Sequence, residues 1–340
     1  MRKLFPLFAL TSLLLLLRPA PGEAQSVTTL KIASVAPDGT PWADGVLQFK
    51  KTVETGSGGK LLVKAFLNGA LGDENETVQT CQRGGIQGVG ASTGALASIV
   101  PELAVLELPR LFRSEAEADY ILDTVVLSTL EKAMQSKGLQ LGFWSENGYR
   151  SFGTSYGFIK SPADLKGHKM RSQESGVHIE MYRAFGASPV PIPVTEVLTS
   201  LQTGVIDGYD NTPLFAFAAQ WTSATKYFTI SNHIYQPAAI VFNKAFFDAL
   251  PADQKALLLS ARGGLANQMR KEIRALNPIL IANLSEMKVQ TYTPTAAELA
   301  TFDAPAKVAR DTYLAKASSG EKALYAQIVK GLETYRAAHK

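Results

Sequence analysis

The stretch that decides the fold runs from Tyr149 to Thr212 and is organised around three motifs: NGYRSF at 147–152, LKGHKMR at 165–171 and LQTGVIDGYDN at 201–211. The first two place Arg150 and Arg171 beside short predicted strands, and the third ends in the carboxamide of Asn211. A guanidinium offers a planar fork of donors that matches a carboxylate bidentately and keeps its charge. A lone arginine is more often a solvated surface cation, but two of them with an amide at strand ends indicate a site for a carboxylate.

Strands and helices alternate along the whole chain around this stretch. The predicted strands lie at 29–35, 61–66, 86–91, 139–144, 151–155, 169–172, 238–242 and 288–292. The predicted helices lie at 41–54, 74–83, 114–136 and 176–185, followed by a long helix from 251 to about 284 and two C-terminal helices. Such alternation predicts an α/β fold whose parallel or mixed sheets are covered by helices.

The order of these elements favours two lobes joined by strands near 144–150 and 233–237. We predict lobe I from 25–148 plus about 237–276, and lobe II from 149–236 plus about 277–340. A ligand would then lie between the lobes, which is a usual place for a pocket.

The first 24 residues are typical of an exported protein. Arg2 and Lys3 precede an apolar run from Leu4 to Leu17, and small residues follow at Gly22 and Ala24. This pattern describes a secretory signal peptide. The run is shorter than the roughly 20 apolar residues that a membrane-spanning helix needs. We therefore predict an exported protein with a signal peptide at 1–24, and an uncleaved membrane anchor is the alternative.

Composition argues against several classes of partner. The formal net charge is +4, and the lysines and arginines are scattered without a basic run, so we expect no nucleic-acid partner. Cys81 is the single cysteine, which leaves no intramolecular disulfide to stabilise the fold. The four histidines lie far apart without metal-ligand spacing, so we expect neither a metal nor a cofactor.

One motif supports an enzyme hypothesis. The sequence GASTG at 90–94 follows a predicted strand and matches the nucleophile elbow of α/β-hydrolases, with Ser92 as the nucleophile. A triad also needs a histidine later in the chain, and His233 is the plausible base. Because the pentapeptide is short and arises often by chance, we prefer a small-residue turn that faces a ligand. We expect no enzyme, with a secreted serine hydrolase as an alternative.

Ordered motifs along nearly the whole mature chain resemble those of the DctP-type substrate-binding proteins of TRAP (tripartite ATP-independent periplasmic) transporters. The matches include LGD at 71–73, LPRLF at 108–112, DLKGHKMR at 164–171, FGASPVP at 185–191, LQTGVIDG at 201–208 and SNH at 231–233. The resemblance implies a two-lobed periplasmic-binding-protein fold, or Venus flytrap, with mixed sheets and a long helix spanning both lobes. It also implies a periplasmic monomer, secreted through the cleaved signal peptide, that delivers a small organic acid to TRAP membrane permease subunits.

The resemblance assigns roles to individual residues. Arg171 occupies the place of the arginine that forms the principal salt bridge to the ligand carboxylate, and Arg150 that of a second, assisting arginine. Asn211 matches an asparagine that bonds the same ligand. The remaining candidate ligand contacts are the first-lobe residues Asp73, Glu74 and Ser92, together with Tyr209, Trp221 and His233.

The chain departs from the family pattern where ligand identity is decided. DGYDNT stands at 207–212 in place of the usual Asp-Gly-Gln-Glu-Asn-Pro, and Val194 replaces a common aromatic residue. Phe215, Phe217 and Trp221 then make the next stretch apolar. An apolar ligand carried with an accessory helical-repeat partner is therefore an alternative. Among acids, a C4-dicarboxylate, keto acid, sugar acid or aromatic acid would all fit.

Overall fold

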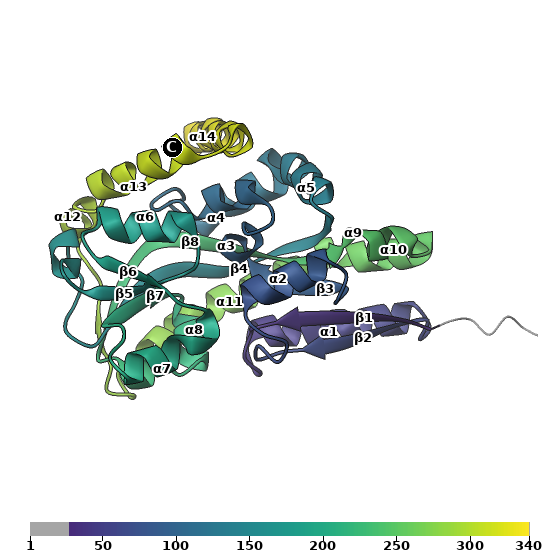
Figure 1. Cartoon of the computed structure of the whole chain (residues 1–340), viewed down its shortest axis with the longest axis horizontal. Coiled ribbons are helices and arrows are strands. Elements are labelled where there is room, and N and C mark those ends of the chain that lie inside the picture. Colours follow the sequence, from purple (N-terminus) through teal and green to yellow (C-terminus); the bar gives the residue numbers. More distant parts are fainter. Residues whose placement is uncertain (1–26, 340) are drawn as a thin grey trace, which may run out of the picture.

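The computed structural model describes residues 27–339, so the predicted signal peptide lies outside the described residues. The described strands are β1 (Thr28–Ser34), β2 (Leu61–Phe66), β3 (Gly88–Ser92), β4 (Leu139–Thr154), β5 (Lys169–Ser172), β6 (Ser188–Pro191), β7 (Gly208–Asn211), β8 (Tyr227–Asn243) and β9 (Gln290–Tyr292). They form one mixed sheet in the order β2-β1-β3-β8-β4-β7-β5-β6, and β9 pairs with β8 (Figure 1). We call the half with β1–β3 lobe I and the half with β5–β7 lobe II.

Two long antiparallel strands, β4 and β8, run through both lobes and join them. Their register extends from Leu139 opposite Asn243 to Thr154 opposite Tyr227. The prediction of separate strands at 139–144 and 151–155 was wrong, because β4 continues through the intervening residues. It does so with three register shifts, one of them between Glu146 and Gly148. Gly148 has φ 97°, a conformation that glycine adopts without strain, so its turn signal marks a β-bulge.

Helices cover both faces of the sheet (Figure 1). The α-helices are α1 (Pro41–Gly56), α2 (Glu74–Gln82), α3 (Thr93–Leu96), α4 (Glu115–Tyr120), α5 (Leu127–Ser136), α6 (Gly176–Ala184), α7 (Val197–Gln202), α8 (Pro213–Ala218), α9 (Lys244–Ala249), α10 (Ala252–Leu259), α11 (Gly264–Asn283), α12 (Ala296–Ala300), α13 (Asp303–Lys316) and α14 (Ser319–Ala338). Short 3₁₀ or π segments are η1 (Pro101–Glu107), η2 (Ile121–Val125), η3 (Pro162–Leu165), η4 (Val194–Glu196), η5 (Trp221–Ala224) and η6 (Ser260–Arg262).

Two predicted helices are each interrupted. The expected helix at 251–284 is α10 and α11, separated by η6 and by Gly263, whose φ of −93° and ψ of −97° are not helical. Adjacent glycines at 263 and 264 weaken a helix there, since each costs about 1 kcal/mol relative to alanine. The expected helix at 114–136 is α4 and α5 around the π-turn η2. The lobe-spanning role falls to α11, which packs against α1 in lobe I and α8 in lobe II.

Alternate residues of β8 build the two cores of lobe I. Ala239 and Val241 belong to one apolar cluster, whereas Ile240 and Phe242 belong to another. Successive side chains of a strand point to opposite faces, so the sheet separates two apolar layers. Two further clusters, around Phe152 and around Trp221, form the cores of lobe II.

The C-terminal helices contact both lobes. Helix α13 packs on α6 in lobe II. Helix α14 instead contributes Leu324, Ile328 and Leu332 to the first core of lobe I. The chain therefore crosses back to lobe I near its end, a crossing that the predicted boundary near residue 277 does not contain. The residue boundaries of the lobes otherwise stay a prediction. None of the helices described at 27–339 is long and apolar enough to cross a bilayer.

Candidate functional site

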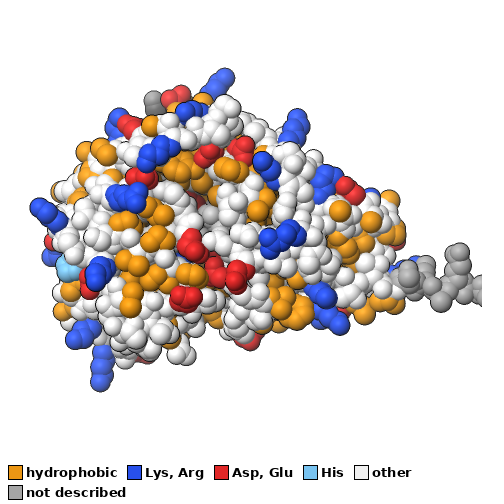
Figure 2. All heavy atoms as spheres, viewed as in Figure 1, with side chains coloured by type: hydrophobic (Ala, Val, Ile, Leu, Met, Phe, Trp, Pro, Cys, Tyr) orange, Lys and Arg blue, Asp and Glu red, His pale blue; other side chains and the backbone are white. Residues whose placement is uncertain are grey.

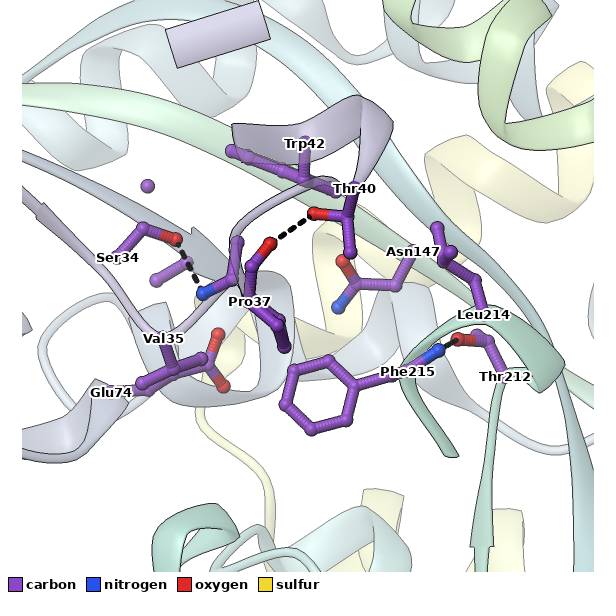
Figure 3. Close-up of a pocket in the computed structure, with 13 residues that line it drawn as sticks. Ser34, Val35, Pro37, Thr40, Trp42, Glu74, Asn147, Thr212, Leu214 and Phe215 are labelled. Atoms are coloured by element: carbon purple, nitrogen blue, oxygen red, sulfur yellow. Dashed lines mark hydrogen bonds between the residues drawn. The ribbon is translucent and has the colours of Figure 1, made fainter. Parts of the chain in front are cut away.

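Two adjoining compartments lie between the lobes. The inner compartment is polar, has about 280 Å³ of empty space, and is lined by both arginines with Gln173, Asn211 and Gln236. The outer compartment has about 440 Å³ of empty space, and its walls come from the β1–α1 loop and from the start of α8 (Figure 3). The two compartments share four lining residues, which are Val35, Glu74, Asn147 and Phe215.

The charge of Arg150 is compensated within the protein. Its side chain is 2% exposed, and Nε donates to Asp210 Oδ2 at 2.5 Å. Nη2 donates to the Asp210 carbonyl, and Nη1 to Gln236 Oε1 at 2.8 Å and Asn211 Oδ1 at 3.3 Å. Burial raises the pKa of Asp210, but Arg150 and the nearby histidines outweigh it and hold the pKa well below the usual value. Arg150 and Asp210 therefore form a buried ion pair.

Arg171 has no such partner. It is 3% exposed at β5, and Nε donates to the carbonyl of Ile192 at 3.0 Å. Across residues 27–339, Arg171 takes part in no ion pair, although its guanidinium lies 5.7 Å from the ring centre of Trp221. Burial, and then repulsion by Arg150, lower its pKa to about 10. A buried charge without a counterion is unfavourable, so this position favours an anion.

Asn211 is oriented by its neighbours. Its Oδ1 accepts from the backbone N–H of Thr212 at 2.8 Å as well as from Arg150. Since the oxygen is occupied and the side chain lines the inner compartment, the amide nitrogen is left to donate to a ligand.

Glu74 stands where the two compartments meet. Its carboxylate accepts from the Ser92 backbone N–H at 2.9 Å and from Ser92 Oγ at 2.8 Å. Burial, with a smaller contribution from the charges of Asp73 and Glu107, outweighs the Ser92 hydrogen bonds and raises the pKa of Glu74 to about 7. Asp73 caps α2 and accepts from the Val194 backbone N–H at 2.9 Å across the cleft.

Ser92 is placed as a structural hydrogen-bonding group. Its Oγ donates to Glu74 and accepts from Gln173 Nε2 at 2.8 Å in the other lobe. The predicted base, His233, bonds Ser231 Oγ through Nδ1 at 2.8 Å and stacks on Phe152 with ring centres 4.1 Å apart. Among the described partners of Ser92 there is no histidine nitrogen, so these contacts do not form a hydrolase triad.

Several polar contacts close the cleft behind and beside the cavity. His178 of α6 bonds Glu107 of η1 through Nε2 at 2.6 Å, and both side chains are fully buried. At the exposed rim, Asn75 Nδ2 donates to Glu174 Oε2 at 3.0 Å. The lobes are therefore held in a closed arrangement.

The structure brings together most of the predicted site residues. Arg150, Arg171, Asn211 and Glu74 line the cavity, and Asp73 and Ser92 contact that lining. The other three lie behind it. Tyr209 is fully buried beside Trp221, with ring centres 5.0 Å apart, and His233 lies 3.5 Å from Asp210.

Sequence reasoning missed lining residues of two kinds. Val35 is an apolar wall residue, and Asn147, Gln173 and Gln236 are neutral amides; Phe215, which the sequence marked only as part of an apolar stretch, is a second apolar wall residue. Gln173 lies two positions after Arg171 at the end of β5, and that spacing was the available signal, because residues i and i+2 share a face. At 27–339 no cluster of three His, Cys, Asp or Glu side chains is arranged to hold a metal.

Comparison with known proteins gives consistent matches. The model of the bacterial extracellular solute-binding proteins of family 7 (DctP) matches residues 32–316. A solute-binding protein of Verminephrobacter eiseniae is 38% identical over 242 residues, which cover 71% of this chain and 72% of that protein. The 2,3-diketo-L-gulonate-binding periplasmic protein YiaO of Escherichia coli is 31% identical over 247 residues, which cover 72% of this chain and 75% of that protein.

A solved structure shares the fold over nearly the whole chain. It is the sugar acid binding protein DctPAm from Advenella mimigardefordensis in complex with galactonate. The TM-score is 0.85 at 27% identity, and the match covers 90% of this chain and 99% of that one. This likeness confirms the predicted two-lobed α/β fold.

Proposed function

Because the chain belongs to the bacterial extracellular solute-binding proteins of family 7, the DctP family of TRAP-type solute receptors, we propose that its solute is a sugar acid whose carboxylate binds Arg171. The family is one of receptors and not of enzymes, and its members bind small organic acids. Its periplasmic members work with TRAP permeases. We extend that location and those permease partners to this chain, with the predicted signal peptide as its export signal.

One observation carries the proposal: two buried guanidinium groups share a compartment, and only one of them forms an ion pair within residues 27–339. Asp210 is paired with Arg150, whereas Arg171 is buried and has no carboxylate within ion-pair distance among those residues. A ligand carboxylate at Arg171 would supply the missing charge and restore its pKa.

The hydrogen bonds within the protein indicate different roles for the two arginines. Nε of Arg171 is engaged by the Ile192 carbonyl, so its two Nη groups are left to grip a carboxylate end-on. The nitrogens of Arg150 already donate to Asp210, Gln236 and Asn211. We therefore assign Arg150 to orienting Asn211 and to adding positive potential, in place of the direct second bond that the sequence suggested.

Polar groups beyond the arginines suit hydroxyl groups on the ligand. Asn147, Gln173 and Glu74 line the inner compartment and offer both donors and acceptors. The Escherichia coli relative is named for 2,3-diketo-L-gulonate, and the Advenella protein holds galactonate. Both ligands are six-carbon sugar acids, which supports this class over the apolar-ligand alternative.

A thermal-shift panel tests the proposal. The chain from Gln25 would be screened with galactonate, 2,3-diketogulonate, succinate and benzoate, beside Arg171→Ala. The matched control is Arg183→Ala, which removes an exposed arginine from α6. A ligand at a hundredfold excess over its Kd should stabilise by about 2.7 kcal/mol. We expect a sugar acid to stabilise the wild type and the control but not Arg171→Ala.

Two results would contradict the proposal. One is stabilisation by an acid that Arg171→Ala leaves unchanged. The other is an apolar molecule found by mass spectrometry of the denatured protein, with no response to any acid after that molecule is removed.

A further inference from the structure

We infer that Glu74 makes this receptor selective for monocarboxylates with a neutral, hydroxylated far end, and that it rejects the matching dicarboxylates. This inference rests on the proposed function, since it takes the binding of one carboxylate at Arg171 as given. It concerns the opposite end of the ligand.

The inner compartment has one cation available to an anionic ligand. Arg150 and Arg171 bring two positive charges, and Asp210 pairs with the first. A ligand carboxylate would pair with Arg171, while Glu74 lines the same compartment as an acid that pairs with neither arginine. A second carboxylate on the same ligand would find no cation left, because Glu74 is the one charged side chain among the described residues that line the outer compartment.

Glu74 is held firmly at the junction of the compartments. It is the first residue of α2, and both of its oxygens accept hydrogen bonds from Ser92. Ser92 is in turn fixed by Gln173 from the facing lobe. A carboxylate gripped in this way cannot turn away from an approaching anion. It can still accept a hydrogen bond from a ligand hydroxyl, and charge-assisted bonds of that kind are strong.

The walls of the outer compartment also disfavour a second carboxylate on the ligand. Figure 3 shows the ring of Phe215 and the indole of Trp42 on the walls of the outer compartment, with the Glu74 carboxylate at its edge. Pro37 and Leu214 extend these walls. A carboxylate loses hydration there without gaining a positively charged partner among the described lining residues, which is unfavourable. A carbon chain with neutral hydroxyls suits such walls better.

The surroundings of Glu74 set how the rejection depends on pH. Asp73, the N-cap of α2, and Glu107 on η1 are the acids that act on it, and Arg150 and Arg171 line the same inner compartment. Acidic side chains also gather near the centre of the face in Figure 2, where the lobes meet. Because the pKa of Glu74 is raised to about 7, mild acid neutralises it and should weaken the rejection.

Matched acid pairs test the inference by titration calorimetry. Galactonate and galactarate share six carbons and the same hydroxyl pattern, but the far end is CH₂OH in one and a carboxylate in the other. Gluconate with glucarate and erythronate with meso-tartrate extend the series. The proteins are the wild type, Glu74→Gln, and Glu174→Gln as a control that removes one acid at the rim.

We expect the wild type to bind the best monocarboxylate at least about 30-fold more tightly than its dicarboxylate, since like charges in contact are strongly unfavourable. Glu74→Gln should reduce that ratio to a few-fold, and Glu174→Gln should leave it unchanged. In the wild type alone, lowering the pH from about 8 to about 5.5 should also reduce the ratio, because the ligand acids stay ionised there.

The outcomes separate the two claims. Equal binding of both members of a pair by the wild type, or a ratio that responds to neither Glu74→Gln nor pH, would overturn the inference. In that case the proposed function would still stand, provided that Arg171→Ala loses binding. Binding that does not depend on Arg171 would overturn both.

Discussion

Asp210 Oδ2 lies 2.5 Å from Arg150 Nε, and both side chains are buried. Tyr182 also donates its hydroxyl to Asp210 at 2.8 Å, so the carboxylate is fully occupied by the protein. This pair distinguishes the two arginines of the cleft. Arg150 is part of the protein's own framework, and Arg171 is available to a ligand.

Breaking this pair should destabilise the fold. Asp210→Asn leaves the buried Arg150 uncompensated, beside the second cation at Arg171, and removal of one partner of a buried pair costs about 3–5 kcal/mol. Urea unfolding without ligand measures this loss. The control is Asp303→Asn, which removes an exposed pair with Arg110 and should cost under about 1 kcal/mol. Similar losses in the two variants would contradict the assignment.

Removing the positive charge of Arg171 should affect ligand binding and not destabilise the unliganded fold. Arg171→Met replaces a buried charge without a counterion by an apolar side chain of similar length. We expect the unliganded protein to keep its stability or gain about 1–4 kcal/mol, and to lose its stabilisation by the ligand. Urea unfolding with and without the ligand measures both effects. A large loss of stability without ligand would show that Arg171 serves the fold.

The bond between Glu107 and His178 should keep the cleft closed. His178→Ala removes this buried contact between the lobes, and the bound ligand should then dissociate at least about tenfold faster with a smaller change in association rate. Stopped-flow fluorescence resolves the two rates. Asn75→Ala removes the exposed rim contact with Glu174 and should change dissociation far less. A change confined to the association rate would refute the closing role.

Glu74 should make stability depend on pH. Its pKa is about 7 in the folded protein against a usual 4.5, so the folded state holds the proton more tightly. The contribution of this group to stability therefore falls as pH rises from about 4.5 to about 7. As the pH rises across that window, the melting temperature of Glu74→Gln should therefore increase relative to that of the wild type. Glu54→Gln should instead run parallel to the wild type there, because Lys50 lowers the pKa of Glu54 and confines its effect to pH values below about 4.5. Parallel curves for Glu74→Gln would contradict the raised pKa.

Local patterns were enough to predict most of the fold. The alternation of strands and helices predicted the α/β class, and β2 lies where its apolar run placed it. Continuity was harder to predict, because Gly148 reads as a turn in the sequence but forms a bulge within β4. The course of α14 back to lobe I depends on contacts with residues about two hundred positions earlier, which no local pattern encodes.

The site was predicted only in part, because it too depends on contacts between distant segments. Arg171 and Asn211 follow from the motifs, but the pairing of Arg150 with Asp210 needs the register in which Ser151 lies opposite Asn211. Tyr209 lies two residues from Asn211 yet packs into the core beside Trp221. The walls of the outer compartment come from segments that are far apart in the sequence, so Phe215 and Trp42 line one compartment only in the folded chain.

A crystal structure of the protein with its bound acid tests the central claim most directly. The account predicts that the two carboxylate oxygens lie about 2.7–2.9 Å from the Nη groups of Arg171, with Arg150 still bonded to Asp210. It also predicts a ligand hydroxyl on Glu74. A carboxylate bound in the outer compartment, or on Arg150 with Asp210 displaced, would contradict it.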